Sequence, residues 1–218
     1  MVGRETAKTL ERFYSRLYRS FGPQGWWPAR TRFEVIAGAI LTQNTAWTNV
    51  ERAIRNLRKG ALLTPAGMHA APVGRIAELI RPAGYFNVKA RRLKNFTSHL
   101  FDRHGGSLTR LFGAPPDLLR GELLSINGIG PETADSIILY AAARPEFVVD
   151  AYTKRILARH GLVDRGAGYE ELKGLFMENL PGDVEMFNEY HALLVRTGKA
   201  FCRTREPRCA ECPLREFL

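Results

Sequence analysis

Apolar side chains recur along this chain at the three- and four-residue spacing of amphipathic helices, and no alternating strand pattern persists. The first stripe covers residues 7–21 and ends where the segment 21–28, rich in Gly and Pro, breaks the helix. Residues 33–41 are almost all apolar or small, which predicts a buried helix. Further helices are predicted over residues 47–57, 73–80, 90–104, 108–112 and 117–124. The pattern therefore predicts an all-α protein.

The segment from Ile126 to Pro131 predicts a tight hairpin between two helices. Gly128 and Gly130 are free to adopt positive φ around the apolar Ile129, and Pro131 suits the first position of the next helix. The backbone N–H groups of such a turn and the helix N-terminus converge on one point. They can therefore hold a phosphate oxygen without reading base sequence.

An aspartate, Asp150, follows the apolar run Phe147-Val-Val and opens another helix. Aspartate is favoured at the N-cap, where its carboxylate accepts hydrogen bonds from unpaired backbone N–H groups. Capping alone is one interpretation of Asp150. A carboxylate at this place can also serve as both cap and catalyst.

The hairpin followed by this aspartate resembles the helix-hairpin-helix DNA glycosylases of the endonuclease III superfamily, from about Trp26 to the C-terminus. The resemblance implies a two-lobed, nearly all-helical enzyme of base excision repair that removes damaged bases from double-stranded DNA. It implies a helical-barrel domain over residues 29–144 and a second helical domain formed by residues 1–28 and 145–218. The hairpin and Asp150 are then expected to border the cleft between the two domains.

The resemblance also implies roles for individual residues. Asp150 is the catalytic carboxylate, which stabilises positive charge on the sugar and takes a proton from the attacking water. Lys154 and Arg155, one turn later, could hold flanking phosphates, and a solvated basic helix face is the alternative. The hairpin residues expected to bind the DNA backbone are Gly128, Ile129 and Gly130.

Glu132 departs from the pattern of those family members that also cut the DNA strand. These enzymes carry a lysine at this position, whose amine forms a Schiff base with the sugar. A carboxylate cannot form an imine, so the sequence predicts a monofunctional glycosylase without AP-lyase activity. The alternative role for Glu132 is an acidic residue that interacts favourably with the helix macrodipole.

The run Leu41-Thr-Gln43-Asn44-Thr45 ends the buried helix. In the family, a residue at the Asn44 position enters the gap that a flipped base leaves in the duplex. Amides suit this task because they hydrogen-bond an orphaned base while staying uncharged. Gln43 and Asn44 are both candidates for this plug, and a solvent-facing helix end is the alternative.

All three tryptophans lie near segments that the family places at the base pocket. Indole faces attract cationic rings, so they favour alkylated purines such as 3-methyladenine, and the motifs resemble the 3-methyladenine glycosylases most closely. The alternative is that these rings pack the core. Segment 81–90 also contributes to this resemblance, and in it we interpret Tyr85 and Phe86 as core residues and Lys89 as a cation facing a groove. The predicted pocket residues are Trp26, Trp27, Pro28 and Trp47.

The three cysteines follow the spacing Cys202-x6-Cys209-x2-Cys212. Endonuclease III-like enzymes bind a [4Fe–4S] cluster with this spacing and a fourth cysteine, whose position is occupied here by Leu218. Three alternatives to a four-cysteine cluster stay open: a non-cysteine fourth ligand, a loop that has lost its metal, and zinc held by three cysteines and a histidine. Nearby arginines would offset the thiolate charge while facing DNA: Arg203, Arg205 and Arg208.

Composition agrees with a nucleic-acid partner. Of the 218 residues, 32 are Lys or Arg and 22 are Asp or Glu, which gives a formal charge of +10. This excess of positive charge favours a polyanionic partner such as DNA, and the alternative is a basic surface that only contacts solvent. With no apolar leader or membrane-length apolar run, we expect a monomeric cytoplasmic protein, nucleoid-associated if bacterial. Two other functions remain open: a glycosylase for oxidised or mismatched pyrimidines and a non-catalytic DNA-binding module.

Overall fold

The computed structural model describes residues 2–218, with side chains from Arg4 onward. Within these residues every regular element is helical and no β-strand occurs, so the all-α prediction is confirmed. The chain forms two compact units. One comprises Met1–Pro28 and Pro145–Leu218, and the other comprises Ala29–Arg144.

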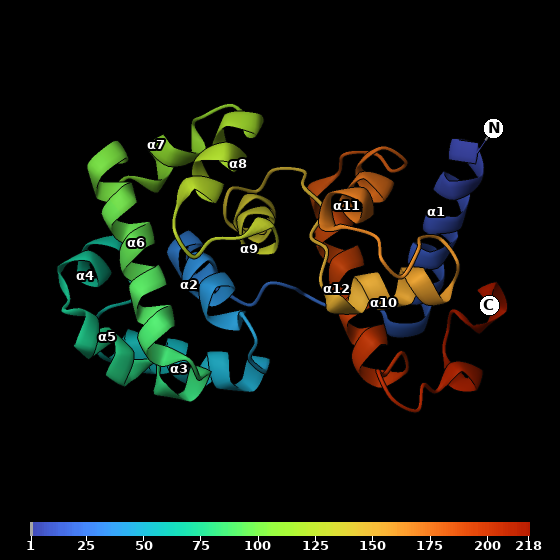
Figure 1. The fold of residues 1–218 in the computed structure, drawn as a ribbon, viewed down its shortest axis with the longest axis horizontal. Helices are drawn as coiled ribbons and strands as arrows, with labels where there is room; N and C mark the ends of the chain where they lie inside the picture. The colour runs from blue at the N-terminus through green and yellow to red at the C-terminus, as the bar shows by residue number, and fades with distance from the viewer. Residues whose placement is uncertain (1) are drawn as a thin grey trace. The chain divides into compact units, whose positions relative to one another are not determined.

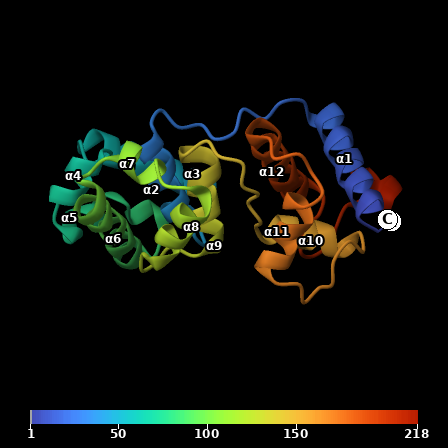
Figure 2. The same ribbon diagram turned by 90° about the horizontal axis from the view of Figure 1, so that it is seen from above.

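The unit 29–144 is built around α2 (Arg32–Thr42), whose residues 33–41 are all buried. Because α2 is apolar on nearly every side, neighbouring helices pack around it, and its one buried acidic residue, Glu34, pairs with Arg58. In contact with it are α3 (Trp47–Lys59), α6 (Phe86–His104), α9 (Pro131–Ser136) and the π-helical segment η2 (Ile137–Ala141). Figures 1 and 2 show this unit, with the long α6 running beside α4 (Pro65–Ala70) and α5 (Val73–Leu79). The unit is completed by η1 (Arg81–Ala83), α7 (Leu108–Phe112) and α8 (Pro116–Ser125).

The other unit centres on α12 (Val184–Ala200), which packs against α1 (Val2–Phe21) and α10 (Ala151–Arg159). A Cβ atom at Gly198 of α12 would lie 2.4 Å from a ring carbon of Tyr152, so only glycine allows α10 to come this close. Buried aromatic rings fill the core of the unit, among them Phe147 and Tyr190. It is completed by α11 (Tyr169–Met177), η3 (Cys209–Glu211) and η4 (Arg215–Phe217).

Several helix limits differ from those predicted. Helix α1 begins at Val2 and not at residue 7, and α6 begins at Phe86 and not at residue 90. Helix α4 was not predicted, because its six residues bury only Met68 and so carry no stripe. Its start is nevertheless locally encoded by the Thr64 cap and by Pro65. None of the described helices is both long and apolar enough to cross a membrane.

The interpretation of Lys89 as a groove-facing cation was wrong. The side chain is buried, and its Nζ donates to the carbonyl oxygens of Leu41 and Ala83, both at 2.8 Å. The last carbonyl groups of a helix lack intrahelical partners, so Lys89 satisfies one at the end of α2. Burial, with a smaller effect of Arg92, lowers the pKa of this lysine to about 8. Tyr85 was also assigned wrongly, because it is 73% exposed rather than part of the core.

Helix α6 supports the hairpin that joins α8 to α9. Its Asn95 donates from Nδ2 to the carbonyl oxygen of Asn127 at 3.0 Å. Glu122 of α8 contacts α6 through one carboxylate oxygen, which lies 2.7 Å from Nε2 of His99 and 2.6 Å from Nε2 of His104. Burial opposes ionisation of Glu122, but the two imidazoles outweigh it and lower its pKa. The hairpin is therefore attached to a fixed scaffold.

Candidate active site

Asp150 caps α10. Its backbone is extended, and its Oδ1 accepts hydrogen bonds from Thr153 N at 2.8 Å and Thr153 Oγ1 at 3.0 Å. The capping role anticipated from sequence is therefore present. Only 13% of the side chain is exposed, so this carboxylate is held in one orientation in a largely desolvated place.

The second oxygen of Asp150 faces a residue that sequence analysis missed. Nε2 of His191, which is buried on α12, lies 3.7 Å from Oδ2. Burial alone would raise the pKa of Asp150, but interactions with His191 and Thr153 outweigh burial and hold the pKa below its ordinary value. The carboxylate is therefore ionised at neutral pH, as a group that stabilises positive charge must be.

The other end of α10 contacts the cysteine loop. Arg155 donates from Nε to the carbonyl oxygen of Cys202 at 2.6 Å, and Arg159 donates from Nη1 to Sγ of Cys202 at 3.1 Å. Lys154 donates from Nζ to the carbonyl oxygen of Ala167 at 2.6 Å. Lys154 and Arg155 thus have structural contacts, and their contact with DNA phosphates stays a prediction. A single helix links Asp150 to the cysteines.

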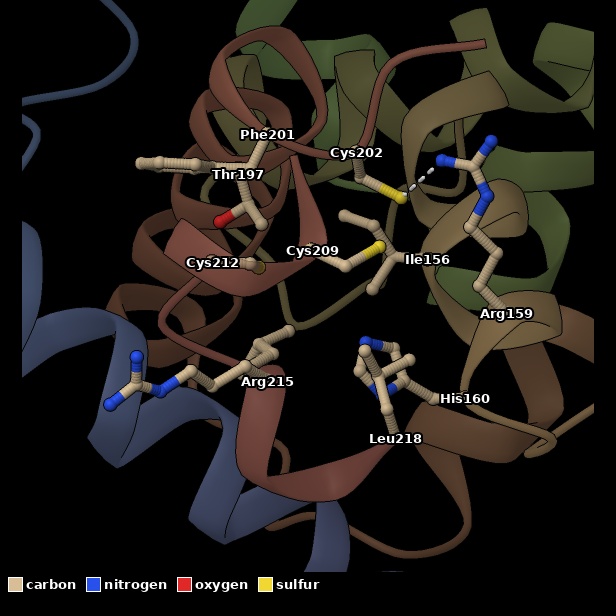
Figure 3. Close-up of a pocket in the computed structure, with 11 residues that line it drawn as sticks. Ile156, Arg159, His160, Thr197, Phe201, Cys202, Cys209, Cys212, Arg215 and Leu218 are labelled. Carbon is tan, nitrogen blue, oxygen red and sulfur yellow. Dashed lines mark hydrogen bonds between the residues drawn. The ribbon is translucent and has the colours of Figure 1, made fainter. Parts of the chain in front are cut away.

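The cysteines line one cavity. Figure 3 shows Cys202, Cys209 and Cys212 there, together with His160 and Leu218. All three thiols are free of disulfide bonds. Burial raises the pKa of the Cys212 thiol, and the neighbouring Cys202 and Cys209 raise it further. Three converging thiols next to a guanidinium are a donor set that fits a thiolate-bound metal centre.

The spacing of the sulfurs distinguishes between kinds of metal centre. Tetrahedral zinc with Zn–S bonds of about 2.3 Å brings its sulfurs to about 3.8 Å from one another. Among the described residues, only His99, His104 and Glu122 offer three metal-ligand atoms all within 4.8 Å of one another. The three cysteine sulfurs therefore do not all lie within 4.8 Å of one another. An iron–sulfur cluster spreads its thiolates over several irons and therefore accepts sulfurs that lie farther apart than in a zinc site.

The hairpin residues occupy the turn before α9. Gly128 has φ +98°, and a Cβ there would lie 2.3 Å from Cγ of Arg92, so glycine is required. Gly130 differs from the expectation: its φ is −95°, and a Cβ there would meet no atom within 4 Å. Pro131 stands at the start of α9, as predicted, and Ile129 is buried as the anchor of the turn. Space beside Gly130 is therefore open.

The two plug candidates have different surroundings. Gln43 donates from Nε2 to the carbonyl oxygen of Gly128 at 3.1 Å and to Oγ1 of Thr133 at 2.9 Å, and it accepts from Arg92. It thus ties the end of α2 to the hairpin. Asn44 is exposed and has φ +52°, a left-handed conformation that asparagine tolerates better than most residues.

The predicted pocket residues belong to both units. Trp26 and Trp27 lie beside each other, with ring centroids 5.1 Å apart, and Pro28 next to them is exposed. Trp47 stands at the start of α3 in the other unit, where its Nε1 donates to Glu51 at 3.0 Å. A pocket shared by these residues stays a prediction, as does the cleft between hairpin and Asp150. Glu132 is exposed in the first turn of α9.

Two helical units, a hairpin anchored on α6 and a capped aspartate define an all-α helix-hairpin-helix fold. Residues 37–182 match the model of the HhH-GPD superfamily of base excision DNA repair proteins, and the chain belongs to that superfamily. A Methanocaldococcus jannaschii protein described as a DNA repair glycosylase is 50% identical over 95% of this chain and 94% of its own length. Endonuclease III of Sulfolobus acidocaldarius is 29% identical over 86% of this chain and 82% of its own length.

Solved structures agree with this assignment. A 3-methyladenine DNA glycosylase of Helicobacter pylori, bound to 1,N6-ethenoadenine, has a TM-score of 0.76 at 25% identity and covers 89% of this chain and 97% of its own. An endonuclease III trapped covalently on DNA has a TM-score of 0.83 at 23% identity, covering 97% of this chain and 94% of its own. The resemblance to helix-hairpin-helix glycosylases of the endonuclease III superfamily is confirmed.

Proposed function

We propose that this protein is a monofunctional DNA glycosylase that hydrolyses the N-glycosidic bond of alkylated purines such as 3-methyladenine in double-stranded DNA. The observation that carries the proposal is Asp150, a desolvated carboxylate kept ionised by His191 and Thr153. Cleavage of the glycosidic bond develops positive charge on the sugar, and a fixed anion stabilises that charge strongly in a desolvated site. The same carboxylate can accept a proton from the attacking water.

The hairpin supplies the second part of the proposal. Open space beside Gly130 lets a phosphate approach the backbone N–H groups at the start of α9. Gln43 donates to the carbonyl oxygen of Gly128 and accepts from Arg92, and these contacts stabilise the turn. A turn of this kind binds DNA without regard to sequence. This property suits an enzyme that must search long stretches of DNA for a lesion.

The choice of base rests on the paired indoles of Trp26 and Trp27 and on the likeness to the Helicobacter pylori enzyme. Endonuclease III relatives favour a second candidate, a glycosylase for oxidised or mismatched pyrimidines. A panel of duplexes with methylated purines, thymine glycol or a G·T mismatch separates the two. We expect the fastest base release from the methylated purines, and faster release from either pyrimidine lesion would favour the second candidate.

The absence of strand cleavage can be tested through Glu132. Because its carboxylate cannot form an imine, borohydride added during turnover should trap no protein–DNA adduct, and the abasic product should break only after alkali. Glu132→Lys provides the matched variant in which an amine occupies the same exposed position. An adduct with the unmodified protein would identify another amine as the nucleophile and contradict the monofunctional assignment.

Asn44 is the plug in this proposal, and Gln43 a support of the hairpin. Asn44→Ala should slow base release about tenfold, because flipping costs a few kcal/mol and about 1.4 kcal/mol corresponds to tenfold. Its affinity for undamaged DNA should not change. Gln43→Ala should instead lower the free energy of unfolding by about 1–3 kcal/mol, through loss of its hydrogen bonds, and weaken binding to all duplexes. Equal effects of the two substitutions on base release from lesions would contradict this division of roles.

His191 sets the pH range in which Asp150 works. The pKa of Asp150 is lowered by His191 against the effect of burial, so activity should fall only when pH drops below the ordinary range of an aspartate. In His191→Gln the pKa should rise, and the acidic limb of the kcat/KM profile should move to higher pH. His69→Gln in the other unit is the control. An unmoved limb would show that His191 does not tune Asp150.

We further propose that Cys202, Cys209 and Cys212 hold an iron–sulfur cluster. Such a cluster, when bound, would organise the basic loop between these cysteines, where Arg203 and Arg205 are exposed. Anaerobically purified protein should then contain iron and acid-labile sulfide. Protein prepared without oxygen that contains neither would contradict the proposed cluster.

A further inference from the structure

The cavity that holds the cysteines lacks a fourth thiol. In the cysteine pattern, the position of the fourth ligand is occupied by Leu218, which lines the cavity but has no atom that binds a metal. The side chain is 65% exposed. Three thiolates would therefore leave one iron of a four-iron cluster without a protein ligand, unless another element supplies one.

Helix α10 supplies a suitable side chain. His160 follows the last residue of α10 and lines the same cavity as the three cysteines (Figure 3). Its ring is held in place by an edge contact with Phe13, with the ring centroids 5.0 Å apart. The spacing of residues in the sequence does not predict that His160 lies near the cysteines, because the packing of α10 against α12 brings it to the loop.

The hydrogen bond of His160 fixes which nitrogen is available. Its Nδ1 lies 3.2 Å from the carbonyl oxygen of Phe217. A carbonyl only accepts hydrogen bonds, so Nδ1 must carry the proton and the lone pair of the neutral imidazole is on Nε2. Metal-binding histidines generally show this arrangement, in which one ring nitrogen donates to a carbonyl and the other binds the metal.

We propose that His160, through Nε2, is the fourth ligand of a [4Fe–4S] cluster held by Cys202, Cys209 and Cys212. This inference rests on the cluster proposed above and is independent of the base that the enzyme removes. It makes α10 a direct link between the two functional groups of its unit. Asp150 caps the beginning of this helix, and the metal ligand stands at its end.

Pulsed electron paramagnetic resonance on the full-length protein tests the ligand directly. The protein is reconstituted anaerobically with ferrous iron and sulfide, reduced with dithionite, and prepared with unlabelled histidine or with histidine carrying ¹⁵N in the ring. We expect a nitrogen hyperfine coupling that changes with the ring label. His160→Ala should lose this coupling and about one iron of the four, whereas the control His69→Gln should keep both.

Two further variants guard against a folding defect. Leu218→Cys leaves His160 intact and restores the usual fourth thiolate, so it should retain full iron content but lose the nitrogen coupling. His160→Cys should likewise retain the iron without the coupling. A four-iron cluster without histidine coupling in the unmodified protein would overturn the assignment of His160 alone. Protein that takes up only zinc, or no metal, would overturn the cluster as well.

Discussion

Asp150→Asn should reduce the rate of base release by at least about 10²–10³-fold, the effect of removing one preorganised group that stabilises transition-state charge. The amide keeps the size of the carboxylate and can still cap α10 through its oxygen, so the fold should persist. Because a negative charge is removed from the site proposed to bind DNA, affinity for DNA should stay equal or rise. Single-turnover base release and equilibrium binding measure the two quantities separately.

Asp164→Asn is the matched control for Asp150→Asn. It removes the same charge from an exposed position of the same unit and should leave base release unchanged. Turnover by Asp150→Asn close to that of the unmodified protein would contradict the catalytic assignment. A marked loss of thermal stability would indicate that the aspartate serves mainly as a helix cap.

Substitutions in the hairpin should have the second-largest effect, this time on binding. Gly128→Val introduces a branched side chain at φ +98°, where its Cβ collides with Arg92. The turn should distort and affinity should fall at least about tenfold, equivalent to about 1.4 kcal/mol, for damaged and undamaged duplexes alike. Affinities must be compared at one salt concentration, since phosphate contacts make binding depend strongly on salt.

Gly130→Ala separates loss of the phosphate contact from loss of the fold. The added methyl group meets no protein atom, so thermal stability should be unchanged while the methyl obstructs the approach of a phosphate. Weaker binding with an unchanged Tm is therefore the expected result. If either substitution weakened binding to damaged DNA only, the turn would belong to the base pocket and not to the backbone contact.

The features that sequence analysis predicted well are locally encoded. Pro131 and Asp150 each begin a helix through their own ring or side chain, and the buried α2 follows from one apolar run. Signals of this kind can be read from the sequence because the residues that produce them are neighbours in the chain. The lengths of α1 and α6 were underestimated, since the first turn of α1 is mostly polar or small and α6 begins after Tyr85 without a side-chain cap.

The residues that escaped prediction owe their surroundings to tertiary packing. His191 reaches Asp150 from α12, and His160 reaches the cysteines from α10. Lys89 was interpreted as a groove-facing cation. Lysine is rarely buried, but here two carbonyl oxygens compensate its burial. Neither the hydrophobic periodicity nor any sequence motif predicts these contacts.

The most direct test of the central claim is release of free base under single-turnover conditions from a duplex that contains a methylated purine. We expect the unmodified protein to release the base far faster than it is lost spontaneously and to leave the strand intact until alkali is added. Tight binding of the same duplex without release of this base, or of any base in the lesion panel, would contradict it and identify the chain as a DNA-binding module without glycosylase activity.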